Sequence, residues 1–407
     1  MSANYNPNIA EAPDHDEIGC TFIVDSVEDV VDPDDGVTTL REAIYAANSR
    51  SGRERIVFQL ASGSEIKLTE QLDITDDLII TGLGAENLTI SGNDKFNNFC
   101  IKNAKVAIDG LTIAKGQDGI SVRSGSHLTV TNSVFSNNAN DGIDIGGDGN
   151  RVSVSKTSFI GNGEDGIKVD GDCNIINVSH SLLSKNKDDG IDVKGNSHTI
   201  VLSEVILSDN GDNGVEAGTT SSTISASNSS FVANGEDGFN LDEGDNNSII
   251  LNNLVVSNNA DDGIDIISNG NSLNLSQVTI TANKEDGIQI NGNYNKFTAC
   301  NSTFNHNATH GVDINGNSNT VRLIGIASTA NGKDGLAIGG KYNSITSINS
   351  YFIGNRHDGL SLDKSGKSRI NVSCSLFSSN TGNSVVSNRV KDYTKNEVEP
   401  RIKSNSQ

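Results

Sequence analysis

The chain has 407 residues and is strongly acidic, with 30 Lys and Arg against 52 Asp and Glu and a formal net charge of −22. Nucleic acid and membrane lipid are therefore not expected as partners, because both bind basic surfaces. Calcium or a cationic partner suits the negative charge, and an acidic polysaccharide would need bridging cations. Aromatic residues make up 4% and tryptophan is absent, which excludes a core of large aromatic side chains.

Residues 1–19 contain neither the basic stretch nor the apolar run of a signal peptide. We expect this segment to be disordered. No run in the chain approaches the roughly 18 apolar residues of a membrane span, so we expect no membrane insertion. Export would then use a leaderless route, or the sequence is that of a mature chain, and a cytoplasmic location stays open.

Residues 20–98 are predicted to form an N-terminal cap and the first coils of a larger structure. TTLREAIYAAN predicts an amphipathic helix, because apolar residues recur at helical spacing from Leu40 to Ala47, and Thr39 with Glu42 forms a capping box. The helix would cover an otherwise exposed apolar end and sheet edge. Strands are predicted in CTFIVDSVEDVV before the helix and, after it, at 56–60, 65–68, 72–74 and 78–82.

Residues 99–390 contain a repeat whose most regular member is a glycine. Eight of the ten intervals between successive glycines are 24 residues long, one is 23 and one is 25. Chance does not produce such spacing, so the repeat is structural. The glycines are Gly119, Gly142, Gly166, Gly190, Gly214, Gly238, Gly263, Gly287, Gly311, Gly335 and Gly359.

Each repeat has the same pattern around its glycine. Apolar residues follow one and three positions later, as at Ile143 and Ile145, with a polar residue usually between them, which is typical of a strand with one buried face. An asparagine precedes the glycine by four positions, as at Asn162, and most repeats carry another asparagine eight positions after it, as at Asn174. We interpret glycine as permitting a turn, Asn and Asp as satisfying backbone groups there, and isoleucine as filling the interior.

Three short strands per 24 residues, all coiling in one direction, predict an all-β fold, a right-handed parallel β-helix solenoid of about a dozen coils. Successive coils would stack about 4.8 Å apart, so equivalent residues would form ladders. The chain is then one elongated domain with an N-terminal helix cap and a polar C-terminal tail at 391–407.

The segment FIVDSVEDVVDPDDGVTTLREAIYAAN resembles the LREA-type N-terminal segment of secreted bacterial β-helix proteins. The NxxDGIxIxGNxN repeats resemble those of pectate-lyase-like proteins, including mannuronan C5-epimerases and NosD-type proteins. The resemblance covers nearly the whole chain and implies an extracellular or cell-surface location, with carbohydrate as the commonest ligand. The tyrosine and the DPH-type motif of the epimerases have no counterpart here, so the resemblance does not carry over their activity.

Candidate catalytic residues lie where the acidic turn pattern changes toward the C-terminus. Stacking would bring three basic residues onto adjacent coils, with an aspartate on the neighbouring strand. Abstraction of a sugar C5 proton by a lyase or epimerase needs a base and a cation that stabilises the resulting enolate. The candidates are His310, Asp313, Lys333, Arg356 and His357, and two turn tyrosines that could stack on a sugar are Tyr294 and Tyr342. Basic residues that merely relieve repulsion in an acidic stack are the alternative.

Acidic residues occupy the two positions before the glycine on consecutive coils. Stacked carboxylates repel one another, which bound cations would relieve, and Ca²⁺ prefers oxygen ligands. The sequence therefore suggests a Ca²⁺ site, against the alternative of a solvated acidic face. The candidate ligands are Asp188, Asp189, Glu236, Asp237, Asp261, Asp262, Glu285 and Asp286.

The near-constant length of the turns and the absence of tryptophan favour a binding or structural protein that contacts a polysaccharide or cell-surface glycan. A polysaccharide lyase or C5-epimerase acting on an acidic polysaccharide is the alternative. The sequence leaves the oligomeric state, monomer or homo-oligomer, undetermined.

Overall fold

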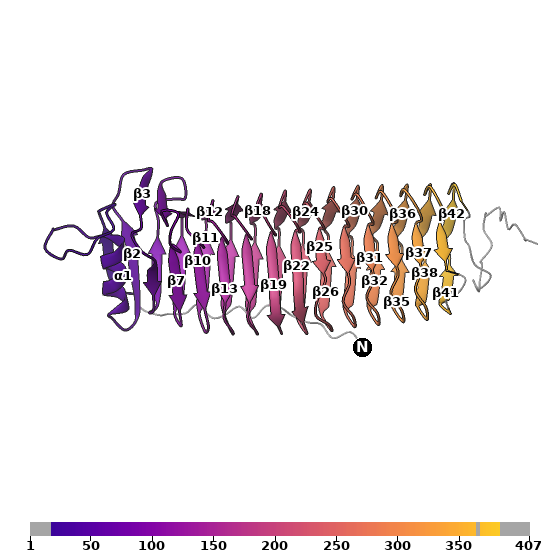
Figure 1. The fold of residues 1–407 in the computed structure, drawn as a ribbon, viewed down its shortest axis with the longest axis horizontal. Helices are drawn as coiled ribbons and strands as arrows, with labels where there is room; N and C mark the ends of the chain where they lie inside the picture. Colours follow the sequence, from indigo (N-terminus) through magenta and orange to yellow (C-terminus); the bar gives the residue numbers. More distant parts are fainter. Residues whose placement is uncertain (1–17, 364–366, 383–407) are drawn as a thin grey trace, which may run out of the picture.

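The computed structural model describes residues 18–363 and 367–382. The tail at 391–407 and all of segment 1–19 except its last two residues lie outside this range. The described residues form one elongated stack of coils, with three parallel sheets running along its length (Figure 1). We name them sheet A, sheet B and sheet C, with 15, 14 and 13 strands respectively. The predicted parallel β-solenoid is confirmed, with about 13 turns.

Each regular coil contributes one strand to each sheet, in the chain order C, A, B. Sheet A contains β1 (Ile18–Val24), β2 (Arg53–Phe58), β5 (Leu78–Thr81), β8 (Lys105–Asp109), β11 (His127–Thr131), β14 (Arg151–Ser155), β17 (Ile175–Ser179), β20 (Thr199–Ser203), β23 (Thr223–Ser227), β26 (Ser248–Asn252), β29 (Ser272–Ser276), β32 (Lys296–Cys300), β35 (Thr320–Ile324), β38 (Ser344–Ile348) and β41 (Arg369–Ser373).

Sheet B contains β3 (Ser64–Lys67), β6 (Leu88–Ser91), β9 (Thr112–Ala114), β12 (Val134–Ser136), β15 (Ser158–Ile160), β18 (Leu182–Ser184), β21 (Ile206–Ser208), β24 (Ser230–Val232), β27 (Val255–Ser257), β30 (Thr279–Thr281), β33 (Thr303–Asn305), β36 (Ala327–Thr329), β39 (Tyr351–Ile353) and β42 (Leu376–Ser378).

Sheet C contains β4 (Leu72–Ile74), β7 (Phe99–Lys102), β10 (Ile120–Arg123), β13 (Ile143–Gly146), β16 (Ile167–Asp170), β19 (Ile191–Asn196), β22 (Val215–Thr220), β25 (Phe239–Leu241), β28 (Ile264–Ile266), β31 (Ile288–Ile290), β34 (Val312–Ile314), β37 (Leu336–Ile338) and β40 (Leu360–Leu362).

The predicted helix is α1 (Leu40–Asn48), which lies at the N-terminal end of the stack (Figure 1). Its capping box is present, because Thr39 accepts from the backbone of Glu42 and the Glu42 carboxylate accepts from the backbone of Thr39. Leu40 and Ile44 are fully buried and belong to the same apolar core as the coils. The helix therefore continues the core at the end where a bare coil would expose it.

The core is a set of ladders, because the register keeps equivalent residues in line. Ile143 pairs with Ile167, and Ile167 pairs with Ile191. On sheet B, the Phe135 and Phe159 rings stack with centroids 4.8 Å apart. One apolar cluster thus extends through the whole stack. No single coil could bury its apolar face alone, so each coil depends on its neighbours.

The repeat glycines have a different role from the one expected. We expected them to permit a left-handed turn, and this is wrong, since none of them has a positive φ. A Cβ at Gly142 would lie 2.6 Å from the carbonyl oxygen of Gly166 and 2.6 Å from Cδ1 of Phe159. Glycine is therefore required because the next coil approaches too closely for a side chain.

The asparagine four residues before each glycine from Gly142 onward forms a continuous buried ladder. The Asn186 side-chain amide donates to Oδ1 of Asn210 at 3.0 Å, and Asn210 donates to Oδ1 of Asn234 at 3.1 Å. Each Oδ1 also accepts from the backbone N–H of the asparagine on the preceding coil. The ladder satisfies the polar groups of a buried turn, as expected from the repeat.

Candidate functional site: an acidic face along sheet C

A second ladder is formed by the residue directly before the repeat glycine, which is Asp or Asn on every coil except that of His310. Its side chain turns inward, and its Oδ1 accepts from the backbone N–H one coil further on. Asp165 accepts in this way from Asp189 at 2.8 Å, and Asp189 accepts from Asn213 at 2.7 Å. Asn213 fills the same position and accepts from Asp237 at 3.0 Å. The Asp of the repeat is therefore first a structural residue.

The outward residue at the centre of each sheet C strand lies three positions after this aspartate. The register places these residues side by side on successive coils, as in the pairs Asp192 with Glu216 and Asn240 with Asp265. Together the two columns form what we call the acidic face. Its acidic members are Asp118, Asp141, Asp144, Asp165, Asp189, Asp192, Glu216, Asp237, Asp262, Asp265, Asp286, Asp313, Asp334 and Asp358.

Burial raises the pKa values of several carboxyl groups on the acidic face. It raises the pKa of Asp165 to about 8, of Asp189 to about 9 and of Asp262 to about 9, and the nearby carboxylates add to the effect. The pKa of Asp237 rises to about 8 for the same reason. Without a cation, the face therefore keeps protons that isolated carboxyl groups would have lost near pH 4.

Three groups of described side chains could each hold a metal ion, and all their members lie on the acidic face except Asp261, which stands directly beside it. Within each group the potential ligand atoms lie within 4.8 Å of one another. Each group spans two adjacent coils, and the three pairs of coils follow one another along the axis. The groups are Asp189, Asp192 and Glu216; Asp237, Asp261 and Asp262; and Asp286, His310 and Asp313.

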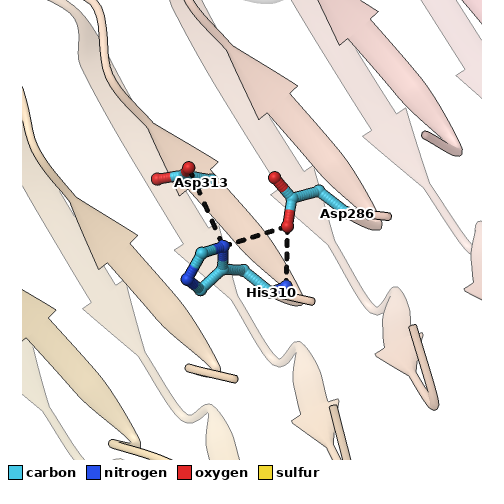
Figure 2. A group of neighbouring side chains, drawn as sticks. All are labelled: Asp286, His310 and Asp313. Carbon is cyan, nitrogen blue, oxygen red and sulfur yellow. Dashed lines mark hydrogen bonds and ion pairs between the residues drawn. The ribbon is translucent and has the colours of Figure 1, made fainter. Parts of the chain in front are cut away.

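The third group places a histidine among aspartates (Figure 2). Nδ1 of His310 lies 3.0 Å from Oδ1 of Asp286 and 3.8 Å from Oδ2 of Asp313, and its Nε2 lies 3.8 Å from Oδ2 of Asp334. Burial alone would lower the pKa of His310, but the hydrogen bond and charge of Asp286 raise it. Conversely, the His310 and Thr309 contacts lower the pKa of Asp286 despite its burial.

The structure separates the expected catalytic residues into two sets. His310 and Asp313 lie together, whereas Lys333, Arg356 and His357 are exposed. Lys333 and His357 belong to the column that contains Thr309, one residue earlier than His310, because the Lys333 N–H donates to the Thr309 carbonyl and the His357 N–H to the Lys333 carbonyl. They therefore do not join the buried group around His310.

The two tyrosines lie on the turn at the other end of the sheet C strands. Tyr294 and Tyr342 are 72% and 57% exposed. Ser318 takes the equivalent position on the coil between them. The ammonium of Lys367 lies 5.7 Å from the centre of the Tyr342 ring.

The expected metal ligands divide by their position in the turn. The inner members Asp189, Asp237, Asp262 and Asp286 are buried, whereas the outer members Asp188, Glu236, Asp261 and Glu285 are exposed. Only Asp261 of the outer set joins a metal-competent group. Asp188 instead contacts Asp212, whose pKa rises to about 6 through burial and this contact.

Asp192 and Glu216 were not among the candidate ligands, and two residues near these groups were also absent from the candidate site. Asp334 lies beside His310, and Lys194 donates to Oδ2 of Asp192 at 2.7 Å. Asp334 could have been found by the repeat spacing, since it stands one coil after His310 at the same position. The repeat spacing does not predict the contact between Lys194 and Asp192, because the direction of the lysine side chain depends on the local packing.

The connections between strands in the regular coils are short, and the acidic face has no walls built from long loops. A depression of about 440 Å³ lies elsewhere, at the corner between sheets A and B, and is lined by Lys156, His180, Glu204 and their neighbours. Another of about 250 Å³ lies in the cap beside Asp29. Neither depression contains a residue of the acidic face. Among the described residues, no helix is long and apolar enough to cross a membrane.

Known proteins share this architecture. A family model described as the right handed beta helix region matches residues 78–255. A mannuronic acid specific polysaccharide family 6 lyase from human gut microbiota has a TM-score of 0.50 at 9% identity, covering 88% of this chain and 87% of that one.

Two further structures are similar at lower scores. The A-module of a mannuronan C-5 epimerase from Azotobacter vinelandii has a TM-score of 0.49 at 14% identity, covering 88% of this chain and 95% of that one. A periplasmic alginate epimerase has a TM-score of 0.44 at 14% identity, covering 83% and 82%. No curated protein matches the sequence. The family match covers less than half of the chain, and together with the three parallel sheets it shows that the chain has the right-handed parallel β-helix fold.

Proposed function

We propose that this protein is a secreted or cell-surface β-helix of binding or structural type, which carries Ca²⁺ on its acidic face and contacts carbohydrate there. The observation that carries the proposal is the concentration of carboxylates in three groups whose ligand atoms lie within 4.8 Å of one another. Ca²⁺ takes about six to eight oxygen ligands at roughly 2.3–2.6 Å, so two or three carboxylates with water would suit it.

Contact with carbohydrate is supported by the spacing of the groups along the face and by the fold. Coils stack about 4.8 Å apart, so groups on successive pairs of coils repeat roughly every 10 Å along the axis. A linear polymer lying along that axis would contact the groups in turn. The lyase that shares the fold is described as specific for mannuronic acid. Because the face is itself acidic, a uronate polymer would need cations between the two sets of carboxylates.

The test combines thermal unfolding with polymer binding. Millimolar Ca²⁺ should raise the melting temperature by mass action, and a chelator should reverse the gain. Immobilised polyuronates should retain the protein in Ca²⁺ and release it in chelator, whereas a neutral glucan should not retain it. An identical melting curve in both conditions, together with no retention by any uronate polymer, would contradict the proposal.

A second function is favoured by the His310 group. A histidine whose Nδ1 is held by a carboxylate presents Nε2 as a base, which suits abstraction of a proton beside a uronate carboxyl group. On this alternative the protein is a lyase or C5-epimerase, with Lys333 or Arg356 moving in with substrate to stabilise the enolate.

Assays for new unsaturated ends and for C5 inversion test this alternative. If the enzyme function holds, His310→Ala should abolish turnover and leave the melting temperature of the coils nearly unchanged. Lys333→Ala and His357→Ala test the exposed candidates in the same way. Activity that survives all three changes would place the site elsewhere, and no turnover of any uronate polymer would favour the binding function.

A further inference from the structure

The group formed by Asp189, Asp192 and Glu216 is the most enclosed of the purely acidic groups. Asp189 and Asp192 are 4% and 3% exposed. Asp192 and Glu216 are direct neighbours on β19 and β22, and Asp189 stands in the turn before Asp192. Two of the three carboxylates are therefore held on paired strands, and the third in the turn directly before β19.

An oxygen in this group lacks the partner that burial requires. Oδ1 of Asp192 is inaccessible to solvent and takes no hydrogen bond from the described residues. A buried carboxylate oxygen without a donor is costly, because its hydration is lost and not replaced. The same column shows the same feature further along, at Oδ1 of Asn240 and Oδ1 of Asp265. The oxygens point to a missing positive ligand.

The other oxygens of the group are held in place. Oδ1 of Asp189 accepts from the Asn213 N–H at 2.7 Å, and Oε2 of Glu216 accepts from the Asn213 side chain at 3.2 Å. Oδ2 of Asp192 accepts from Lys194 Nζ at 2.7 Å. One oxygen of each carboxylate is thus fixed by a donor of the protein. Asp189 and Glu216 also contact each other, and two carboxyl groups in contact need a shared proton or cation.

Lys194 is the movable member of the arrangement. Its side chain is 52% exposed, whereas that of Asp192 is 4% exposed. A lysine ammonium on a flexible stem can leave for solvent at little cost. Lys168, the neighbour of Asp192 on β16, is a second positive charge beside Asp192. Two lysines thus face three carboxylates, which leaves the group short of positive charge.

We propose that Asp189, Asp192 and Glu216 form a Ca²⁺ site, and that Lys194 is a resident counter-ion that the metal displaces from Asp192. The site deepens the proposed function and rests on it, since it locates one cation on the acidic face. It also gives the site a built-in competitor, because Lys194 is the lysine that makes the direct 2.7 Å contact with Asp192.

Calorimetric titration of the full-length protein with Ca²⁺ at fixed pH and ionic strength tests the site. Asp192→Asn should weaken one stoichiometric site by at least about tenfold. Lys194→Gln should tighten the same site by about two- to fivefold, the range of a partly exposed ion pair. Lys187→Gln is the matched control, because this exposed lysine lies on the same coil and makes no ion pair with the group in the described structure.

The possible outcomes test the displacement of Lys194, the site itself and the proposed function separately. An equal gain from Lys194→Gln and Lys187→Gln would overturn the displacement, since net charge alone would explain it. Unchanged stoichiometry and affinity in Asp192→Asn would overturn the site while leaving Ca²⁺ binding elsewhere on the face intact. Should Asp192→Asn fail to fold, Glu216→Gln at the half-buried position replaces it with the same expected loss. No Ca²⁺ binding by the wild-type protein would overturn both this site and the proposed function.

Discussion

The side-chain amide of Asn283 donates to Oδ1 of Asn307 at 3.0 Å, across two coils whose backbones are paired throughout. Asn283 is 1% exposed, so the bond replaces hydration that neither group can regain. Such a pair contributes most when its loss leaves the partner buried and unsatisfied.

Asn283→Ala should therefore lower the free energy of unfolding by about 1–3 kcal/mol, measured by chemical denaturation. Asn317→Ala is the control, because Asn317 makes a similar 3.0 Å bond to Asn293 but is exposed to water. Equal losses in the two variants would show that burial of the ladder does not matter.

Gly190→Ala should destabilise the coils although its backbone is not left-handed. The new Cβ would lie 2.6 Å from the carbonyl oxygen of Gly214 and 3.0 Å from Leu207 Cδ2, so the two coils must move apart. We expect a loss of about 3 kcal/mol in the free energy of unfolding.

Gly149→Ala provides the contrast. Gly149 has a φ of +66°, and a methyl group added there would have no atom within 4 Å, so the change costs only backbone strain of about 1–2 kcal/mol. A larger loss at Gly149 than at Gly190 would contradict the close-approach explanation.

Stability should fall as the pH rises in the presence of chelator. The buried carboxyl groups have folded-state pKa values raised to about 8 at Asp165 and about 9 at Asp189, against about 4 in the unfolded chain. The folded state therefore binds more protons between pH 4 and 9, and its stabilisation is complete below pH 4 and lost as the pH rises through these pKa values. Melting temperature across this range measures the effect.

Asp165→Asn should make the pH dependence shallower without disturbing the ladder, because Asn213 already serves at the same position. Saturating Ca²⁺ should also make it shallower, since a cation replaces the protons. A melting temperature that rises steadily from pH 5 to pH 9 in chelator would mean that these groups are ionised in the folded protein.

The pKa values of two histidines should be shifted in opposite directions. The Asp286 contact raises the pKa of His310 in spite of its burial, whereas burial lowers the pKa of His198. NMR titration of the ring protons should place His310 above, and His198 below, an ordinary imidazole near 6.5. Asp286→Asn should lower the His310 value and leave His198 unchanged. A His310 pKa that does not respond to this change would contradict the pairing.

The cap should depend on one buried ion pair. The Arg41 guanidinium binds the Asp29 carboxylate, with Nη2 to Oδ2 at 2.7 Å and both side chains at most 4% exposed. Arg41→Ala leaves that carboxylate buried and should cost about 3–5 kcal/mol, seen as faster hydrogen exchange in α1 and β1. Arg50→Ala is the control, since the exposed Arg50 lies over the Phe22 ring at 5.8 Å and donates to Sγ of Cys20 at 3.3 Å. Equal exchange in the two variants would argue against the pair as the anchor.

The fold could be predicted because the 24-residue spacing determines it. Ile143 and Ile167 had to share a ladder once their glycines were recognised as equivalent, and Thr39 with Glu42 marked the start of the helix. The chemistry of the turn was harder to predict, because sequence spacing gives a residue's coil and column but not its side-chain direction. His310 and Lys333 lie apart for another reason: they are 23 residues apart, one fewer than the repeat, so Lys333 continues the column of Thr309 and faces water, whereas His310 turns inward.

The constant register means that the chain can change length in whole coils. Thr199 pairs with Thr223, so excision of residues 200–223 would join Thr199 to Ile224 in the geometry that Thr223 has now. Every ladder would close again on the next coil. Tandem duplication of such a segment would lengthen the molecule by the same step. One coil of 24 residues is therefore the smallest change in length that keeps every ladder in register.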